Sequence, residues 1–328
     1  MTYLSLAAGF VLLFFGGEMV VRGAVALARR FEVSPLVIGL TIVGFGTSLP
    51  ELLVCLNAAL SGAPGIAVGN VIGSNLANMM LILGVAALIY PIAVNPSAVR
   101  RDGLVMAAVT AIFIAVALGG SAERHEGALM LAALALYIGL SLWHDARVNG
   151  GAAQLHREEA ESVTGLPKLL WQMVVLVVGG FAAVGFGADL LVDGATAFAR
   201  AAGVPDEVIG LTLVAVGTSL PELATSIVAA YRGHADVSIG NVIGSNIFNL
   251  FGILGVTALA VPVPFADKIV DFDLWVLGGV TLLLLPLLLT GWRLARGEAL
   301  LLLALYGAYV ACQFWGMSGT FPGGAAGA

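Results

Sequence analysis

The sequence has little charge. Of its 328 residues, 14 are Lys or Arg and 20 are Asp or Glu, so charged side chains make up 10% of the chain. A typical soluble domain has about 25%. Hydrophobic residues make up 60% and the net charge is −6, which excludes the basic face of a nucleic-acid binder. So much apolar surface needs lipid as its solvent, and we predict an all-α polytopic protein of a lipid bilayer.

Cysteine and histidine are also scarce. Cys55 and Cys312 both lie in apolar runs, which excludes a disulfide framework and favours small buried side chains. The four histidines fall in expected loops or at helix ends. No imidazole or amine base therefore lies within an apolar segment, so we expect neither an intramembrane hydrolase nor any other enzyme, and no bound cofactor.

Ten apolar segments are long enough to cross a bilayer as helices, which takes about 20 residues each. They are 3–28, 36–60, 66–90, 102–119, 127–144, 169–188, 207–230, 237–261, 272–291 and 297–316. One connection is long and polar, and we interpret residues 146–168 as a solvated hinge between two halves, 1–145 and 169–328. Ten basic residues lie in the loops after odd-numbered spans and three in the loops after even-numbered spans. Basic loops stay in the cytoplasm, so 146–168 is expected to be a cytoplasmic linker and both termini to be non-cytoplasmic.

The two halves repeat each other. Gly-Thr-Ser-Leu-Pro-Glu occurs at 46–51 and again at 217–222, and Gly-Asn-Val-Ile-Gly-Ser-Asn occurs at 69–75 and again at 240–246. Both pairs are 171 residues apart, and 29 of 51 positions are identical between 38–88 and 209–259. Five spans per unit is an odd number, so the second copy enters the membrane in the opposite sense. Inverted repeats of this kind are typical of secondary transporters, with the substrate site where the repeats meet.

The repeated motifs place oxygen ligands inside the membrane. Glu51 and Glu222 fall within apolar spans, where a charge costs at least about 2.5–3.5 kcal/mol unless it faces a cavity or a partner. Hydroxyl and amide side chains three or four residues apart share the same helix faces. The resulting donors are Thr47, Ser48, Glu51, Ser74 and Asn78 in the first repeat and Thr218, Ser219, Glu222, Ser245 and Asn249 in the second. Two carboxylates, two amides and six hydroxyls suit a hard cation such as Ca²⁺, which takes about 6–8 oxygens.

Proline and glycine in the motifs have separate predicted roles. Pro50 and Pro221 each remove a backbone donor and free a carbonyl one turn earlier, where it must find water, protein or an ion. Gly44 and Ala215 are small enough to let an ion approach the backbone. The remaining motif glycines, 69, 73, 240 and 244, are better explained by close helix packing, and the asparagines at 70, 75, 241 and 246 by structural hydrogen bonds.

Glu18 and Asp189 also correspond at the 171-residue offset. Both lie toward the end of a span, so we expect them to reach the membrane interface rather than to bind an ion.

The duplicated motif pair resembles the two alpha-repeats of the calcium/cation antiporter superfamily, and most closely its prokaryotic sodium/calcium exchangers. The resemblance places the motifs at 39–85 and 210–256, and it implies ten helices with the ion sites between spans 2, 3, 7 and 8. It also implies that spans 1 and 6 slide across this core. Matching motif positions carry the family's ligands onto the ten donors above, with backbone carbonyls at Gly44, Gly73, Ala215 and Gly244.

The resemblance implies an antiporter that exchanges Na⁺ for Ca²⁺ in the cytoplasmic (inner) membrane of a bacterium or archaeon, with no protein partner. The family usually carries an acid at the position of Asn249, whereas both repeats here have Asn. The sequence therefore leaves open the number of Na⁺ ions and the coupling ion itself. H⁺/Ca²⁺ exchange is the nearest alternative, because close carboxylates in a desolvated cavity can be neutralised by protonation. A passive cation channel is the alternative from another class.

Overall fold

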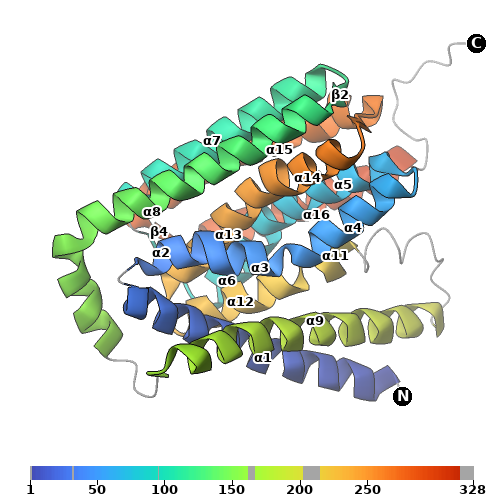
Figure 1. Cartoon of the computed structure of the whole chain (residues 1–328). Helices are drawn as coiled ribbons and strands as arrows, with labels where there is room; N and C mark the ends of the chain where they lie inside the picture. Colours follow the sequence, from blue (N-terminus) through green and yellow to red (C-terminus); the bar gives the residue numbers. More distant parts are fainter. Residues whose placement is uncertain (1, 32, 95, 162–166, 202–214, 318–328) are drawn as a thin grey trace, which may run out of the picture.

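The computed structural model of the chain describes residues 2–31, 33–94, 96–161, 167–201 and 215–317. Almost all of them are helical (Figure 1). Within these ranges seven helices are long and apolar enough to cross a membrane, or eight if a helix pair bent by 48° counts as one span. The seven are Ala7–Phe31, Pro64–Ile89, Val99–Leu118, Arg124–His144, Leu170–Leu190, Ala235–Ala260 and Ile269–Trp292, and the bent pair is Gly39–Thr47 with Leu49–Leu60.

These eight segments coincide with eight of the ten expected spans. The expected span 207–230 lies partly outside the described residues, and its described part forms α11 and α12. The expected span 297–316 is a single helix, α16 (Arg296–Met317).

Secondary structure repeats at the same offset as the sequence. Residue numbers of the two copies differ by 171 at both ends of every pair of elements around the motifs. The pairs are α3 (Gly44–Thr47) with α11 (Ala215–Thr218), α4 (Leu49–Leu60) with α12 (Leu220–Tyr231), α5 (Pro64–Leu76) with α13 (Ala235–Ile247), η2 (Ala77–Ile82) with η4 (Phe248–Ile253), and α6 (Leu83–Ile89) with α14 (Leu254–Ala260). In the first half α2 (Pro35–Ile38) and the π-helix η1 (Gly39–Val43) precede α3.

Short strands join the two halves crosswise. β1 (Ile92–Ala93) pairs antiparallel with β4 (Arg293–Leu294), and β2 (Ser121–Ala122) pairs antiparallel with β3 (Val263–Pro264). Each pair takes one strand from each half, and in Figure 1 the labels β2 and β4 lie at opposite ends of the bundle. Two loops of the first half are therefore each paired with a loop of the second half.

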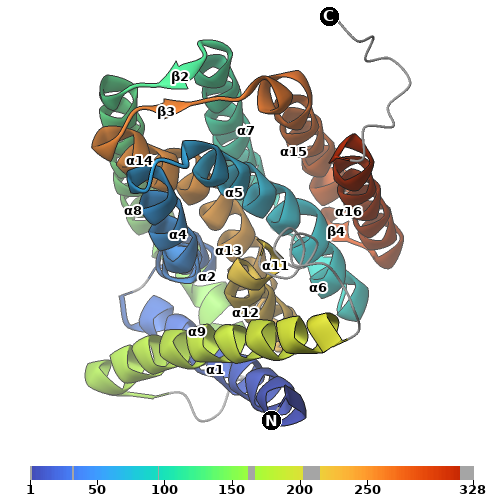
Figure 2. The ribbon, with the colours of Figure 1, turned by 90° about the vertical axis from the view of Figure 1, so that its right-hand side faces the viewer.

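The helices that carry the motifs form the centre of the molecule. In the spans Pro64–Ile89 and Ala235–Ala260, 72% and 83% of an 18-residue apolar stretch is buried inside the protein, against 22% in Arg124–His144. α7 (Pro96–Leu118) and α8 (Arg124–Glu161) flank this core on one side. η5 (Ile269–Asp273) leads into α15 (Leu274–Leu289), which packs against α7 and is followed by η6 (Thr290–Trp292), and α16 lies next to α15 in Figure 2.

α1 (Thr2–Phe31) and α9 (Leu170–Ala201) lie side by side and cover one face of the core (Figures 1 and 2). Glycines bring their backbones together, as small residues do between membrane helices. A Cβ added at Gly16 would lie 2.8 Å from the backbone N of Val184, and one at Gly180 would lie 2.8 Å from that of Val20. The equivalent first helices of the two halves thus form one two-helix unit.

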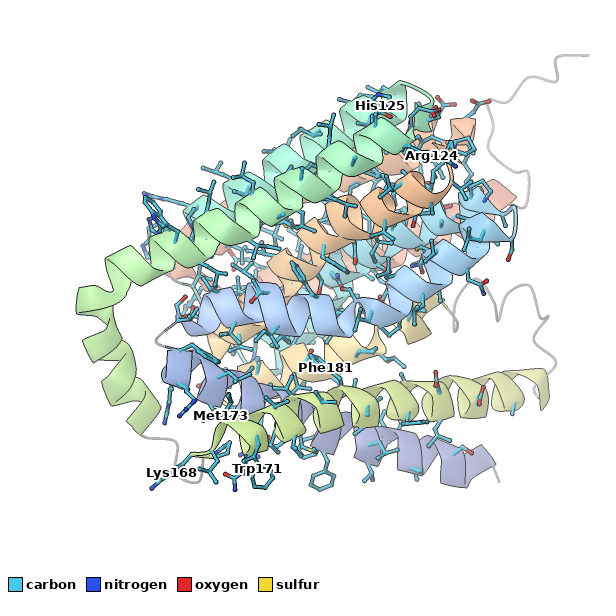
Figure 3. All side chains as sticks on the ribbon, viewed as in Figure 1. Arg124, His125, Lys168, Trp171, Met173 and Phe181 are labelled. Atoms are coloured by element: carbon cyan, nitrogen blue, oxygen red, sulfur yellow. The ribbon has the colours of Figure 1, made fainter. Side chains whose placement is uncertain are left out.

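The polar connection between the halves begins as helix. α8 continues to Glu161, well past the end of its apolar part at His144, so the polar segment expected to link the halves is helical as far as residue 161. Residues 162–166 lie outside the described residues. Figure 3 places Lys168 and Trp171 at the beginning of the next helix, α9.

Glu18 takes part in an ion pair that the sequence alone did not indicate. Its side chain is buried, and its two oxygens accept hydrogen bonds from Nε of Arg22 at 2.6 Å and Nε of Arg232 at 2.7 Å. Its counterpart Asp189 is exposed. The ion pair ties α1 to the end of α12.

Candidate ion-binding site

Both Gly-Thr-Ser-Leu-Pro-Glu motifs break their helix at the serine. Ser48, between α3 and α4, has φ −86° and ψ 6°, and Ser219, between α11 and α12, has φ −91° and ψ 6°. The proline follows at the second position of the next helix in each case. Since proline has no N–H to donate, the carbonyl four residues before it loses its helical partner. In the first repeat the span bends by 48° at this break.

The two glutamates are buried and face the opposite repeat. Glu51 is 1% exposed and Glu222 is fully buried. The Ser48 hydroxyl donates to Oε1 of Glu222 at 2.9 Å, and the Ser219 hydroxyl donates to Oε1 of Glu51 at 3.4 Å. Each repeat thus supplies the hydroxyl that binds the carboxylate of the other. This crosswise pair places both acids at the contact between the two halves.

Several buried oxygens around this pair have no protein partner among the described residues. Oε2 of Glu51 and Oε2 of Glu222 accept no hydrogen bond there, and neither does Oδ1 of Asn78 or Oδ1 of Asn249. Buried polar atoms in proteins are nearly always satisfied, because an unpaired one costs several kcal/mol. Two carboxylates and two amides that each keep an oxygen free form a donor set that fits a cation of the size of Ca²⁺ or Na⁺.

Both amides lie in π-helical turns. Asn78 is in η2 and Asn249 is in η4, and each π-helix separates two α-helical parts of one span. Such turns are frequent at functional sites because they turn a side chain out of its helical register. The Asn78 amide donates to Oδ1 of Asn246 at 3.4 Å, whereas neither polar atom of the Asn249 side chain has a partner in the described part of the chain. The predicted structural role of Asn246 agrees with this contact.

Thr47, Ser245 and Gly44 pack where the first repeat meets α13. The Thr47 hydroxyl lies 3.0 Å from the carbonyl oxygen of Val43 and 3.2 Å from that of Gly44. The Ser245 hydroxyl donates to the Gly44 carbonyl at 3.1 Å. A Cβ on Gly44 would lie 2.9 Å from the backbone N of Ser245, so glycine permits this approach. The Gly44 carbonyl is thus already held by protein donors.

The other predicted residues are placed as follows. Ser74 is buried in α5, Thr218 is half-buried at the end of α11, and Ala215 begins α11. The carbonyls of Gly73 and Gly244 accept helical hydrogen bonds from the residues four positions later. A Cβ on Gly244 would lie 2.2 Å from the Leu40 carbonyl oxygen, which agrees with the packing role expected for this glycine.

Sequence reasoning missed a hydroxyl-rich network behind Glu222. The Asn241 amide donates to Ser226 at 2.8 Å, to Thr225 at 3.1 Å and to the Glu222 backbone carbonyl at 3.3 Å. Asn241 recurs as Asn70, so the repeat marks it, but Thr225 and Ser226 have Val54 and Cys55 at the equivalent positions and carry no such signal.

Cys55 is buried and free, as expected, whereas the free Cys312 is only half-buried.

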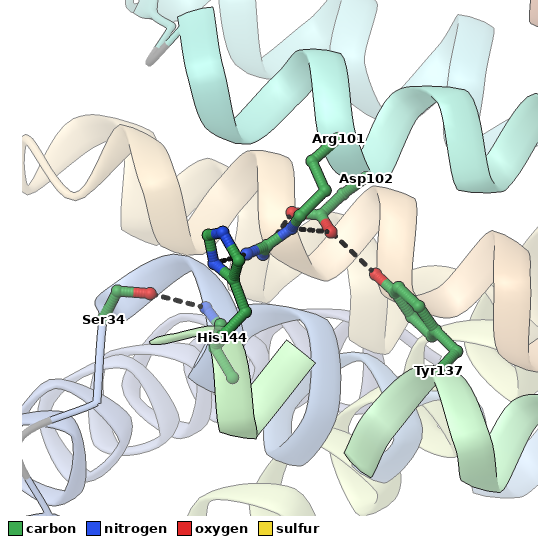
Figure 4. Close-up of polar contacts among 6 residues, drawn as sticks. Ser34, Arg101, Asp102, Tyr137 and His144 are labelled. Carbon is green, nitrogen blue, oxygen red and sulfur yellow. Dashed lines mark hydrogen bonds and ion pairs between the residues drawn. The ribbon is translucent and has the colours of Figure 1, made fainter. Parts of the chain in front are cut away.

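A second pair of buried acids lies in the flanking helices and was also missed. Asp102 of α7 is fully buried, accepts two hydrogen bonds from Arg101 at 2.9 Å and one from Tyr137 at 3.2 Å (Figure 4). Its counterpart Asp273 accepts from Tyr309 at 3.0 Å and from Gln313. These aspartates are bound by protein donors, unlike the free oxygens of the two glutamates, and they join α7 to α8 and η5 to α16.

Helix α9 also reaches the edge of the site. Phe181 points from α9 toward α3 in Figure 3, and a Cβ added at Gly46 would lie 2.2 Å from its Cζ. In the described ranges, no group of three or more His, Cys, Asp or Glu side chains gathers in a way that could hold a metal ion, and the site itself has only the two glutamates. The formal charge of the site therefore comes from two carboxylates.

Comparison with known proteins assigns the chain to a protein family. The sequence profile of the sodium/calcium exchanger protein family matches residues 1–143 and 172–315, which include both repeats. The chain belongs to this family. Among the relatives of this exchanger-family protein is the sodium/calcium exchanger MaX1 of Methanosarcina acetivorans, 39% identical over 95% of the chain and 98% of the relative. Another is the inner membrane protein YrbG of Escherichia coli, 35% identical over 78% of the chain and 79% of the relative.

A solved structure of the sodium-calcium exchanger NCX_Mj, soaked with zero Na⁺ and Ca²⁺, has the same fold as this family member. The TM-score is 0.81 at 34% identity, over 95% of this chain and 98% of that one. The family resemblance inferred from the duplicated motifs is thereby confirmed.

Proposed function

We propose that this protein is a secondary antiporter that exchanges Na⁺ for Ca²⁺ by alternating access through one central site. The observation that carries the proposal is the crosswise pair of buried glutamates, in which Ser48 binds Glu222, Ser219 binds Glu51, and each carboxylate keeps one oxygen unpaired among the described residues. Membership of the sodium/calcium exchanger family supports the choice of ions. Such a site moves cations and catalyses no covalent chemistry.

The proposed ligands come from both repeats. Carboxylate and amide oxygens of Glu51, Glu222, Asn78 and Asn249 form the inner set, since each residue has a buried oxygen that no described group binds. Hydroxyls and backbone carbonyls of the broken and neighbouring helices complete it. These further ligands are Thr47, Ser48, Ser74, Thr218, Ser219 and Ser245, with the carbonyls of Gly44, Gly73, Ala215 and Gly244.

Electrostatics makes binding of the two ions mutually exclusive. The site has a formal charge of −2 in surroundings of low dielectric, so one Ca²⁺ or a small number of Na⁺ ions neutralises it, and both sets together would leave excess positive charge. An empty site has two uncompensated carboxylates, which cannot cross the membrane barrier at low cost. Transport in one direction therefore requires an ion on the way back, which is antiport.

For the architecture we propose ten spans in two inverted repeats, 1–145 and 169–328, joined by the cytoplasmic segment 146–168. The alpha-repeat motifs lie in 39–85 and 210–256. Contacts at the loops support this arrangement. Arg124, at the beginning of α8, donates to the Ala260 carbonyl at the end of α14, and Arg296, at the beginning of α16, donates to the Leu88 carbonyl in α6. In one contact the arginine belongs to the first half and the carbonyl to the second, and in the other contact the roles of the halves are exchanged. Two halves related by pseudo-two-fold symmetry make such reciprocal contacts, as inverted repeats do.

The strand pairs are consistent with the predicted sides of the membrane. β1 and β4 belong to the loops after spans 3 and 9, both expected in the cytoplasm, whereas β2 and β3 belong to the loops after spans 4 and 8, both expected outside. We therefore propose non-cytoplasmic termini in the cytoplasmic (inner) membrane of a prokaryote. Its contacts would be with lipid, Na⁺ and Ca²⁺, without a protein partner.

The test is uptake of labelled Ca²⁺ into proteoliposomes preloaded with Na⁺. Uptake should need the Na⁺ gradient and should be lost in Glu51→Gln and in Glu222→Gln, because either change leaves a charge of −1 against a divalent ion. Asp189→Asn is the matched control, since Asp189 is an exposed acid on α9, and it should transport normally. Full activity in both glutamine variants would refute the assignment of the site.

The same vesicles separate the alternatives. Uptake in Na⁺-free medium that follows an imposed pH gradient would replace Na⁺ by H⁺ as the coupling ion. Ca²⁺ flux without any ion on the opposite side, and without saturation, would indicate a passive channel.

A further inference from the structure

Asn241 connects three helices at the site. It lies on α13 and is fully buried. Its Oδ1 accepts the hydroxyl of Thr47 from α3 at 3.3 Å, and its amide donates to the Glu222 carbonyl, Thr225 and Ser226, all on α12. Thr225 in turn donates to the Glu222 carbonyl at 3.1 Å. One side chain therefore fixes the backbone that carries Glu222 and a hydroxyl from the other repeat.

The contact between Asn241 and Thr47 affects the direction in which the Thr47 hydroxyl donates its hydrogen. A hydroxyl ligates a cation through a lone pair, so its hydrogen must be donated elsewhere. Thr47 has three acceptors within reach, the Val43 and Gly44 carbonyls and Oδ1 of Asn241. Of these, only Asn241 belongs to the second repeat, so it also sets the position of α3 relative to α12.

The first repeat lacks an equivalent network in the described part of the chain. Asn70, the counterpart of Asn241, donates to the Cys55 thiol at 3.2 Å, and a thiol is a weak acceptor. Val54 stands at the position of Thr225 and is 40% exposed, whereas Thr225 is 1% exposed. The hydroxyl contacts of the acids differ in the same sense, 2.9 Å for Glu222 and 3.4 Å for Glu51. The halves thus carry the same proposed ligands, but among the described residues the hydroxyl network lies beside Glu222 and has no counterpart around Asn70.

We propose that Asn241 is a positioning residue that holds Glu222 and Thr47 as one rigid unit, so that Glu222 is the fixed carboxylate of the site and Glu51 the adaptable one. The proposal rests on the proposed function, because it concerns how the same site presents its oxygens. Asn241 does not ligate the ion in this role, since its polar atoms are bonded to protein. Its effect is on the cost of arranging the ligands before an ion binds.

The experiment compares Asn241→Ala with Asn70→Ala in proteoliposomes and measures initial Na⁺-driven Ca²⁺ uptake against Ca²⁺ concentration. Loss of a buried hydrogen-bond bridge leaves its partners unsatisfied, so we expect Asn241→Ala to raise the half-saturating Ca²⁺ concentration about tenfold. Asn70→Ala should change it less than about twofold, because a weak thiol contact is lost. A role in folding alone would lower the maximal rate per reconstituted protein and leave half-saturation unchanged.

A second pair of variants keeps the test decisive if Asn241→Ala does not fold. Ser226→Ala removes the shortest bond of the network and Cys55→Ala changes the equivalent position, so the first should weaken Ca²⁺ binding more than the second. The independent readout is the rise in melting temperature of the purified protein on adding Ca²⁺. Equal half-saturation in both members of each pair would overturn the proposal. A wild-type protein that neither transports Ca²⁺ nor is stabilised by it would instead overturn the proposed function.

Discussion

Gly244→Ala tests how far the site depends on close helix packing. The added Cβ would lie 2.2 Å from the Leu40 carbonyl oxygen and 2.6 Å from its Cα. Both are backbone atoms, so no rotamer change relieves the overlap. Ordinary contact begins near 3.4 Å, and α13 and η1 must therefore separate by about 1 Å.

The displacement acts directly on the ion site. Ser245 follows Gly244 and donates to the Gly44 carbonyl at 3.1 Å, and Asn241, one turn earlier, accepts from Thr47 at 3.3 Å. Neither distance tolerates a further 1 Å, because a hydrogen bond is lost beyond about 3.5 Å. Overpacking of this kind costs about 1–3 kcal/mol, and misplaced ligands reduce the rate by up to about a hundredfold.

The assay combines Na⁺-driven Ca²⁺ uptake with the melting temperature in detergent. Gly139→Ala is the matched control, because Gly139 is an exposed residue of α8 with no atom within 4 Å of an added Cβ. We expect Gly244→Ala to lower both uptake and melting temperature, and Gly139→Ala to lower neither. Wild-type uptake in Gly244→Ala would refute the argument that the α13–η1 approach sets the ligand geometry.

Three further predictions concern charge. Glu18→Gln removes the carboxylate that accepts from two half-exposed arginines and should destabilise the protein by about 1–2 kcal/mol, seen as a lower melting temperature, while Asp189→Asn should not. Burial, together with the nearby charge of Arg29, lowers the pKa of His234 below its usual 6.5, so the unfolded chain binds a proton that the folded protein does not. Stability should therefore fall as the pH drops through about 6.5, and a melting curve of His234→Gln with the same pH slope would contradict this. Asn249→Asp adds a third carboxylate where the amide has no described partner and should lower the half-saturating Ca²⁺ concentration about tenfold, whereas an unchanged or higher value would place residue 249 outside the ion's reach.

Much of the fold was predictable because lipid restricts the chain to long apolar helices. Segment lengths gave the positions of spans such as Pro64–Ile89 and Ala235–Ala260, and the duplication marked Glu51 and Glu222 as equivalent acids. The continuation of α8 to Glu161 was not predictable in this way, because a polar helix beyond the membrane has no apolar period. The ion pair of Glu18 was not predictable either, because its partner Arg232 is 214 residues away in sequence.

The sequence alone determined which residues form the proposed site, since a repeated Glu flanked by hydroxyls and proline in an apolar span is costly unless it meets a cation or a partner. Only the tertiary structure decided which residue faces which. The crossing of Ser48 to Glu222 and of Ser219 to Glu51, and the network that holds one glutamate more firmly than the other, depend on how two helices from opposite halves approach. Local sequence fixes a helix and its breaks, but distances between helices follow from the packing of the whole chain. A single glycine at a helix contact lets two backbones lie about an ångström closer than alanine would.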